Sequence, residues 1–102
     1  MSLDEFKELL LEADPKATKA SGTSTGERTV WWPGGIDDSL MSDDIEEEVV
    51  RLVYVDRFTK QDHDQIAAAI YTALDGAFIP FRHEVIYENE TGYIHHNFTC
   101  HV

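Results

Sequence analysis

The segment EVVRLVYVDRF at residues 48–58 constrains the fold most, because its density of β-branched and aromatic residues predicts a β-strand. Side chains alternate between the two faces of a strand. A small sheet with one solvated face would need one apolar set, but this segment has two. We therefore expect the second set to be at least partly covered by another subunit or by a loop. The first set is Val50, Leu52 and Tyr54, and the second is Val49, Val53 and Val55, accompanied by Arg51 and Arg57.

Two segments have the periodicity of amphipathic helices. Residues 3–13 form the first, and Ser2 with Glu5 makes the capping-box pattern that starts it. The second is expected to begin at Thr59 with Asp62 and to end near Gly76, a residue type common at helix C-termini. The apolar stripes are Leu3, Phe6, Leu9, Leu10 and Ala13 in the first helix, and Ile66, Ala69, Ile70, Ala73 and Leu74 in the second.

Three further strands are predicted at residues 29–32, 81–88 and 93–102. The order of elements is then helix, strand, strand, helix, strand, strand. This order predicts an α+β fold, in which two helices pack on one face of a mainly antiparallel sheet of four or five strands. A chain of 102 residues suits one domain and is too short for two ordinary ones, so we assign residues 1–102 to a single domain.

Residues 14–28 are predicted to form a mobile loop, because they are rich in Gly, Ser, Thr and Lys and contain no hydrophobic residue larger than alanine. The sequence GTSTGE within this loop lacks the lysine of a phosphate-binding P-loop. The loop therefore carries no specific ligand signal. A role in docking to a neighbouring subunit is open to it.

Trp31 and Trp32 stand at the end of a predicted strand. Paired indoles in such a place are typical of a core or a subunit interface, and ligand stacking is the less favoured alternative. The sequence Pro-Gly-Gly at 33–35 is expected to turn or break the strand. The acidic stretch that follows, at 37–48, lacks the ligand spacing of a calcium loop and reads as a solvated connection.

The sequence HHNFTCH at residues 95–101 gathers three histidines and the only cysteine of the chain. The register of the last hairpin decides where these side chains point, because a slip of one residue exchanges the two faces. A loop at 89–92 pairs Tyr87 with Ile94 and keeps the core face apolar. That face would hold Phe81, His83, Val85, Tyr87, Ile94, His96, Phe98, Cys100 and Val102, and the outer face would hold His95, Asn97, Thr99 and His101 with Glu84 and Ile86.

This register separates the apparent ligand cluster. His95 and His101 lie about 20 Å apart along one face, which is too far to share a metal ion. His83, His96 and Cys100 share the other face and form a weak metal candidate that would need a fourth ligand. We predict no catalytic residue and no cofactor, because no nucleophile motif is present and the many carboxylates single out no acid–base pair.

The net charge of −12 comes from 20 acidic residues against eight Lys and Arg residues. It excludes the class of sequence-reading nucleic-acid binders, which face phosphates with Lys and Arg. No segment is apolar over the length of a membrane span. The single cysteine cannot form an internal disulfide, which fits a reducing compartment such as the cytosol. A basic protein partner is compatible with the charge.

Three consecutive segments carry a family resemblance: the strand VVRLVYVDRF, the helix DHDQIAAAIYTALDGA and the hairpin IPFRHEVIYENETGYIHHNFTCHV, whose turn is Glu90-Thr91-Gly92-Tyr93. In this order they resemble the tail-terminator and minor-capsid (head–tail neck) proteins of long-tailed bacteriophages and prophages. The likeness covers residues 47–102. It implies a non-enzymatic virion protein that assembles in the bacterial cytoplasm as a ring, commonly a hexamer, and whose partners are tail-tube or head-connector proteins.

Contacts between the subunits of such a ring would use apolar, aromatic and histidine side chains that a neighbour can cover. A strongly acidic ring would also let DNA pass without sticking, since like charges repel. The interface candidates are Trp31, Trp32, Val49, Arg51, Val53, Val55, His95 and His101.

Two other functions are left open by the sequence. The first is a small acidic adaptor or DNA-mimic inhibitor, and the second is a metal-dependent enzyme built on His83, His96 and Cys100. The hypotheses predict different observations: a ring, binding to a basic nuclease or DNA-binding protein, or bound metal. The adaptor would bind its basic partner through Asp37, Asp38, Asp43, Asp44, Glu46, Glu47 and Glu48.

Overall fold

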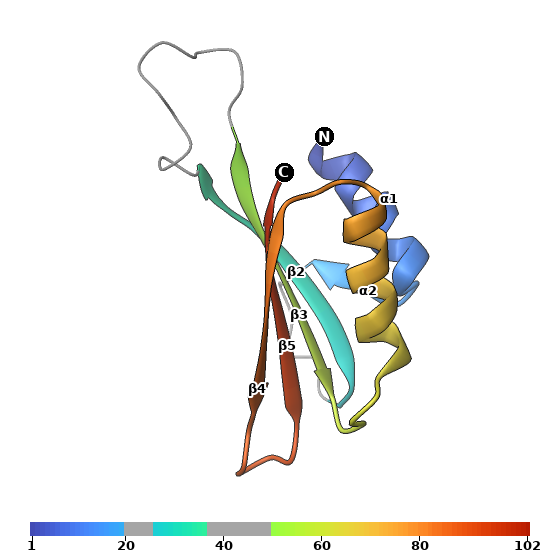
Figure 1. Ribbon diagram of the computed structural model, residues 1–102, viewed down its shortest axis with the longest axis vertical. Helices are drawn as coiled ribbons and strands as arrows, with labels where there is room; N and C mark the ends of the chain where they lie inside the picture. The colour runs from blue at the N-terminus through green and yellow to red at the C-terminus, as the bar shows by residue number, and fades with distance from the viewer. Residues whose placement is uncertain (20–25, 37–49) are drawn as a thin grey trace.

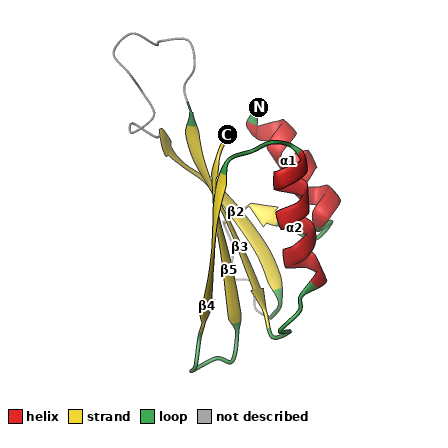
Figure 2. Cartoon of the chain, viewed as in Figure 1, coloured by secondary structure: helices red, strands yellow, loops and turns green. Residues whose placement is uncertain are grey.

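The computed structural model describes residues 1–19, 26–36 and 50–102, which form two layers (Figure 1, Figure 2). Helices α1 (Leu3–Ala13) and α2 (Gln65–Gly76) pack on one face of a sheet with five described strands. All neighbouring strands are antiparallel except the first pair in the spatial order β1-β2-β3-β5-β4, which is parallel. The predicted α+β fold is confirmed. The strands are β1 (Thr18–Lys19), β2 (Arg28–Ile36), β3 (Arg51–Thr59), β4 (Phe81–Tyr87) and β5 (Ile94–His101).

Helix α1 starts where the sequence predicts. The Ser2 hydroxyl accepts a hydrogen bond from the Glu5 N–H, and the Glu5 carboxylate accepts one from the Ser2 N–H, each at 3.1 Å. These two bonds complete the predicted capping box. The apolar face of the helix then buries Phe6 and Leu10 in the core.

Helix α2 begins at Gln65, so the predicted start at Thr59 with Asp62 is wrong. Thr59 is the last residue of β3, and the N-cap is Asp64, whose carboxylate accepts a hydrogen bond from the Ala67 N–H at 2.9 Å. Several residues here could cap a helix. Asp64 takes the position because it also binds a buried arginine of β3, described below.

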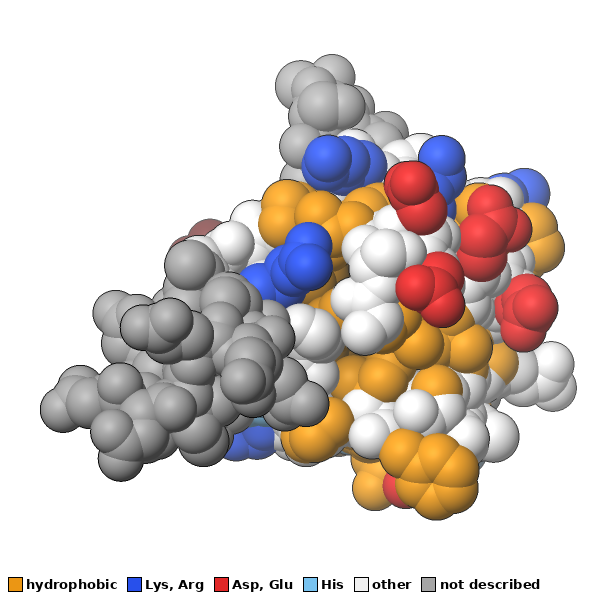
Figure 3. Space-filling model, turned by 90° about the horizontal axis from the view of Figure 1, so that it is seen from above, with side chains coloured by type: hydrophobic (Ala, Val, Ile, Leu, Met, Phe, Trp, Pro, Cys, Tyr) orange, Lys and Arg blue, Asp and Glu red, His pale blue; other side chains and the backbone are white. Residues whose placement is uncertain are grey.

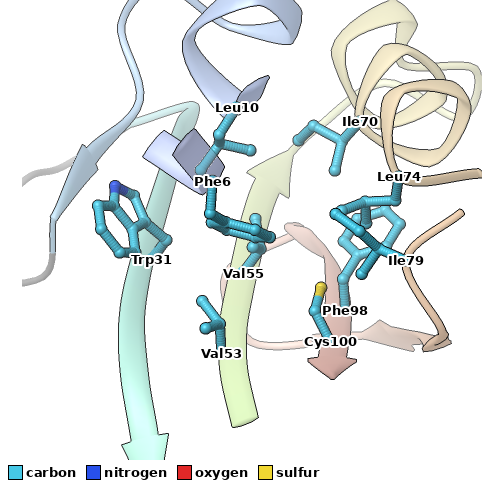
Figure 4. Close-up of a cluster of buried hydrophobic side chains, with 10 residues drawn as sticks. All are labelled: Phe6, Leu10, Trp31, Val53, Val55, Ile70, Leu74, Ile79, Phe98 and Cys100. Carbon is cyan, nitrogen blue, oxygen red and sulfur yellow. The ribbon is translucent and has the colours of Figure 1, made fainter. Parts of the chain in front are cut away.

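The core lies between the helices and the sheet (Figure 4). Val55 pairs with Phe98, and Val53 with Cys100, across β3 and β5, and all four side chains are fully buried. Directly paired residues share one face of a sheet, so these pairs define the face that the helices cover. The buried cluster consists of Phe6, Leu10, Trp31, Val53, Val55, Ile70, Leu74, Ile79, Phe98 and Cys100.

The face of β3 that contains Val53 and Val55 is covered by the helices of the same chain. The prediction that another subunit or a loop covers it is therefore wrong. The opposite face carries Leu52, Tyr54 and Phe58, which are all partly exposed. Alternation along a strand separates two sets of side chains, but it does not say which set faces the helices.

The predicted register of the last hairpin is confirmed. Tyr87 pairs with Ile94, and Val85 with His96, around the loop at 89–92. Gly92 has a φ of 76°, which favours glycine. Val85 and Tyr87 lie on the core face, as predicted, but they are 41% and 69% exposed. The helices do not reach this end of the hairpin (Figure 1), so the core is shorter than the strands that carry it.

The predicted loop at 14–28 is structured at both ends. Asp14 is buried, and its carboxylate accepts a hydrogen bond from the Lys16 N–H at 3.0 Å. Strand β1 lies within this loop and pairs with Val30 and Trp31 of β2. The prediction of a loop is thus wrong at β1. Residues 20–25, and the acidic stretch at 37–48, lie outside the described residues.

Strand β2 continues through Pro33 to Ile36, so the predicted break at 33–35 is also wrong. Strand β1 pairs only with Val30 and Trp31. Pro33 lies beyond that pairing, on a part of β2 where one missing N–H is tolerated. The register with β3 shifts between Pro33 and Ile36.

Substitution of Gly34 by alanine is expected to lower the free energy of unfolding by about 1–3 kcal/mol, because the site has no room for a methyl group. A Cβ at Gly34 would lie 2.6 Å from Cε2 of Tyr54 and 3.2 Å from the Cβ and carbonyl oxygen of Leu52. Gly35→Ala is the matched control, since nothing lies within 4 Å of its Cβ. Urea denaturation of both variants measures the difference, and equal losses would contradict the close packing of Tyr54 over Gly34.

Candidate functional site

The face of the sheet that points away from the helices, called the open face here, collects aromatic and polar side chains. Trp32, Tyr54 and Thr99 lie side by side across β2, β3 and β5, because Tyr54 pairs with both of the others. A second row runs through Phe58 and His95, which also pair directly. No described helix lies over these rows (Figure 1). All five side chains are partly exposed, so the open face offers apolar surface to a partner.

Ring contacts fix the aromatic side chains of the open face. The rings of Trp32 and Tyr54 lie 5.7 Å apart, and the rings of Phe58 and His95 stack at 4.4 Å. The guanidinium of Arg28 lies over the Phe58 ring at 4.1 Å, a cation–π geometry. Rigid aromatic groups lose little conformational entropy on binding, which suits them to protein contacts. A shallow hollow on this face is lined by Leu52, Tyr54, Arg82, Thr99 and His101.

A buried carboxylate anchors the polar part of the open face. Asp56 is 3% exposed, and its Oδ1 lies 2.5 Å from Nε2 of His95 and accepts a hydrogen bond from the Asn97 amide at 2.7 Å. Asn97 in turn accepts a hydrogen bond from the Thr99 hydroxyl at 3.3 Å. These contacts satisfy the buried charge and hold the His95 ring against Phe58. Their effect is to orient the surface side chains.

On the helix side, His83 and His96 form a pair. Nε2 of His83 lies 3.0 Å from Nδ1 of His96, so one ring nitrogen donates and the other accepts. His83 also stacks on Phe98 at 4.4 Å and meets the edge of Tyr71 at 5.8 Å. The pair lines a groove between α2 and the hairpin, together with Asp62, His63, Asp64, Gln65, Ala67, Ala68, Tyr71 and Thr72.

The weak metal candidate of the sequence is only partly assembled. His83 and His96 meet, but Cys100 lies in the hydrophobic core, where burial raises the pKa of its thiol to about 12. With no metal bound, this buried thiol stays protonated and packs as a small hydrophobic side chain. Among residues 1–19, 26–36 and 50–102, no group of three or more His, Cys, Asp or Glu side chains could hold a metal ion.

The histidine pair predicts a loss of stability in mild acid. Burial lowers the pKa of both histidines below the usual value of 6.5, and the charge of His83 lowers that of His96 further. The unfolded chain then binds protons more readily than the folded chain, so stability is complete above the unfolded pKa and declines as pH falls below it. We expect the urea midpoint to fall between about pH 7.5 and 5.5.

The matched variant for this pH dependence is His83→Gln, which keeps a polar side chain and removes one titrating ring. Its urea midpoint should depend less on pH over the same range. His63 is exposed, and His63→Gln serves as the control for the replacement of a histidine outside the pair. A His83→Gln profile parallel to that of the wild type would contradict a role for the pair.

A buried ion pair joins the sheet to both helices. Nε of Arg57 donates to Oδ2 of Asp64 at 2.9 Å, and Nη2 donates to Oδ1 at 3.2 Å. The carboxylate of Asp14, just after α1, lies 4.0 Å from Nη1. Burial raises the pKa of Asp64, but the hydrogen bonds from Arg57 and from the Ala67 N–H outweigh it and hold the pKa below the ordinary 3.8. The cluster has a structural role, because its charges are used within the chain.

The structure divides the interface candidates of the sequence. Trp31, Val53 and Val55 are buried in the chain's own core and do not reach the surface. Arg51 is half-buried at the start of β3, where its backbone pairs with that of Val102. Val49 lies outside the described residues. The remaining three, Trp32, His95 and His101, lie on the open face.

Several surface residues are not among the sequence candidates. Tyr54 and Phe58 alternate with Val53 and Val55, so correct assignment of the covered face would have found them. Ile86 lies on the open face of β4 and is 46% exposed. Phe78 follows α2, has a φ of 58° and is 91% exposed, and no sequence pattern marks it.

Figure 3 shows acidic side chains clustered beside exposed hydrophobic ones at the end of the molecule where both termini lie.

Comparison with known proteins gives one informative result. No protein-family profile matches the sequence, and no protein of curated function matches it either. Among solved structures, the chain is similar to a protein from the virion of a native gene transfer agent (GTA) particle. The TM-score is 0.50 at 12% sequence identity, over 91% of this chain and 83% of that chain. The shared feature is the fold. No described helix is long and apolar enough to span a membrane.

Proposed function

We propose that the chain is a non-enzymatic structural protein of a bacteriophage, prophage or phage-like virion. The observation that carries this proposal is the fold shared with a gene transfer agent virion protein over 91% of the chain. The similarity extends over 91% of this chain and 83% of the other, so it concerns most of the fold and not a single motif. The sequence resemblance to head–tail neck proteins supports the same class independently, because it rests on the order and composition of residues 47–102.

The specific role that we propose is that of a tail-terminator or head–tail joining protein that forms a ring, commonly a hexamer, and contacts tail-tube or head-connector proteins. The open face supports this role. It presents Trp32, Tyr54 and Phe58 partly exposed on a rigid sheet. When one patch on each copy contacts a different patch on the next copy, the copies form a closed ring if the rotation between them allows it. The net charge of −12 suits a ring through which DNA passes.

A second candidate function is supported by the same net charge of −12. An acidic adaptor or DNA-mimic inhibitor would bind a basic protein partner, and the acidic residues that would carry it lie outside the described residues. Binding of a basic partner that weakens steeply with salt would favour this function over ring assembly.

The test of the proposed role uses purified chain, alone and with tail tubes of the same particle, viewed by negative-stain electron microscopy. We expect rings, either free or capping the tubes. Thr99→Arg places a bulky charge in the hollow of the open face and should abolish them. Thr72→Arg makes the same change on the exposed side of α2 and should not. A wild-type chain that neither forms rings nor binds tail tubes or head connectors would overturn the role.

A further inference from the structure

Strand β4 is one edge of the sheet, and its charged residues, Arg82 and Glu84, are of opposite sign. It pairs with β5 over its seven residues, and no described strand pairs with its other side. Its register with β5 is regular, without a bulge. It contains no lysine and no proline, the residues that commonly block an edge. Its outer backbone N–H and C=O groups therefore form a template for one more strand.

Strand β4 also exposes apolar side chains that a partner strand would bury. Val85, Ile86 and Tyr87 are 41%, 46% and 69% exposed, and they stand on both faces of the strand. Beside them on the helix side, Tyr71 is 47% exposed and contacts Phe81 edge-on at 4.9 Å. An added strand would bury apolar surface on both faces at once. That gain comes in addition to the backbone hydrogen bonds.

The charge pattern of β4 fits a second copy of itself. Arg82 and Glu84 point to the same side, 3.4 Å apart, with side chains 74% and 53% exposed. In an antiparallel pair with two-fold symmetry, some residue of β4 stands opposite its own counterpart. If that residue is His83, then Arg82 stands opposite Glu84 of the second copy, and Phe81 stands opposite Val85. Opposite charges in this position attract across the strands.

The neighbouring symmetric registers are unfavourable. A two-fold centred on Arg82 would place two arginines opposite each other, and one centred on Glu84 would place two glutamates opposite each other. Like charges directly opposite on neighbouring strands repel. The sequence Phe81-Arg82-His83-Glu84-Val85 is thus complementary to itself about its central residue.

We propose that two copies of the chain pair through β4, antiparallel and centred on His83, to form a dimer with one continuous sheet. A two-fold contact uses the same patch on both copies and is complete at two chains. It is therefore separate from the ring contact proposed above and does not rest on it. The contact is a single strand pair, so its dissociation constant lies in the micromolar range.

Charge reversal tests the dimer by sedimentation equilibrium. In the proposed dimer, position 82 of each copy lies opposite position 84 of the other. Arg82→Glu alone therefore places two acidic side chains opposite each other in both of these pairs, and Glu84→Arg alone places two arginines opposite each other. Each should raise the dissociation constant of the dimer about tenfold or more, because two attractive pairs become repulsive. The double variant R82E/E84R restores opposite charges and should dimerise as the wild type does. Both side chains are exposed, so the fold should tolerate the changes.

The matched control reverses two exposed charges of α1, Lys7→Glu with Glu8→Arg, and should leave the dimer unchanged. A wild-type chain that stays monomeric through the micromolar range would overturn the proposal. A dimer that none of the β4 variants weakens would overturn it equally, since the contact would then lie elsewhere. Loss of ring or tail binding with an intact dimer would count only against the proposed virion role.

Discussion

Asp64→Ala should lower the free energy of unfolding by about 3–5 kcal/mol, because it leaves the Arg57 guanidinium buried without its main partner. The side chains of Arg57 and Asp64 are 6% and 4% exposed, and two hydrogen bonds join them. Asp64 also caps α2 through the Ala67 N–H, so the substitution removes a cap as well. The expected measurement is a large fall in the urea midpoint at neutral pH.

Three variants separate the two roles of Asp64. Asp64→Asn keeps a capping oxygen and loses the charge, so it isolates the cost of the unpaired arginine. Asp62→Ala removes an exposed carboxylate two residues away and should change stability by less than about 0.5 kcal/mol. Combining Arg57→Met with Asp64→Asn should recover part of the loss, since neither charge is then buried alone. If the double variant loses as much free energy of unfolding as the two single variants together, Arg57 and Asp64 are not coupled and this account of the pair is wrong.

Phe98→Ala should cost about 3–5 kcal/mol as well, through the cavity that it leaves. Phe98 is fully buried, pairs with Val55 on β3, lies 6.0 Å from the ring of Phe81 and stacks on His83 at 4.4 Å. It therefore joins the last hairpin to the core under both helices (Figure 4). Phe98→Leu fills part of the space and should cost less, about 1.5 kcal/mol or below.

The matched control for Phe98 is Phe78, an aromatic residue with the opposite environment. It is 91% exposed with a φ of 58°. Phe78→Ala should be close to neutral, and Phe78→Gly neutral or stabilising by up to about 1 kcal/mol, because glycine adopts this conformation without strain. Thermal unfolding of the set measures the order. A loss at Phe78 comparable to that at Phe98 would contradict the position of the core.

Local signals made much of this fold predictable. The capping box of Ser2 and Glu5 involves residues three apart, and the hairpin register follows from the loop at 89–92 and the alternation of apolar residues. Both are short-range features. What the sequence could not give is the pairing of β3 with β5, which brings Val55 to Phe98 from 43 positions away. The start of α2 likewise depends on a contact between two elements, because its N-cap Asp64 binds Arg57 of β3.

The candidate site was less predictable than the fold. The side of β3 that carries Arg57 looks more polar than the side that carries Tyr54, and yet it is the buried one, because Asp64 neutralises the arginine. Interface candidates chosen from the sequence therefore fell partly in the core. The exposure of Val85 and Tyr87 depends on how far the helices extend over the sheet, which periodicity within one strand does not record.

The proposed place of the chain in a virion is tested most directly by quantitative mass spectrometry of purified particles from cells that encode it. Antibody labelling in the electron microscope then locates the chain on the particle. We expect the chain at a fixed low copy number relative to the major capsid protein, with label at the junction of head and tail. Particles that contain capsid and tail-tube proteins but lack the chain would contradict it.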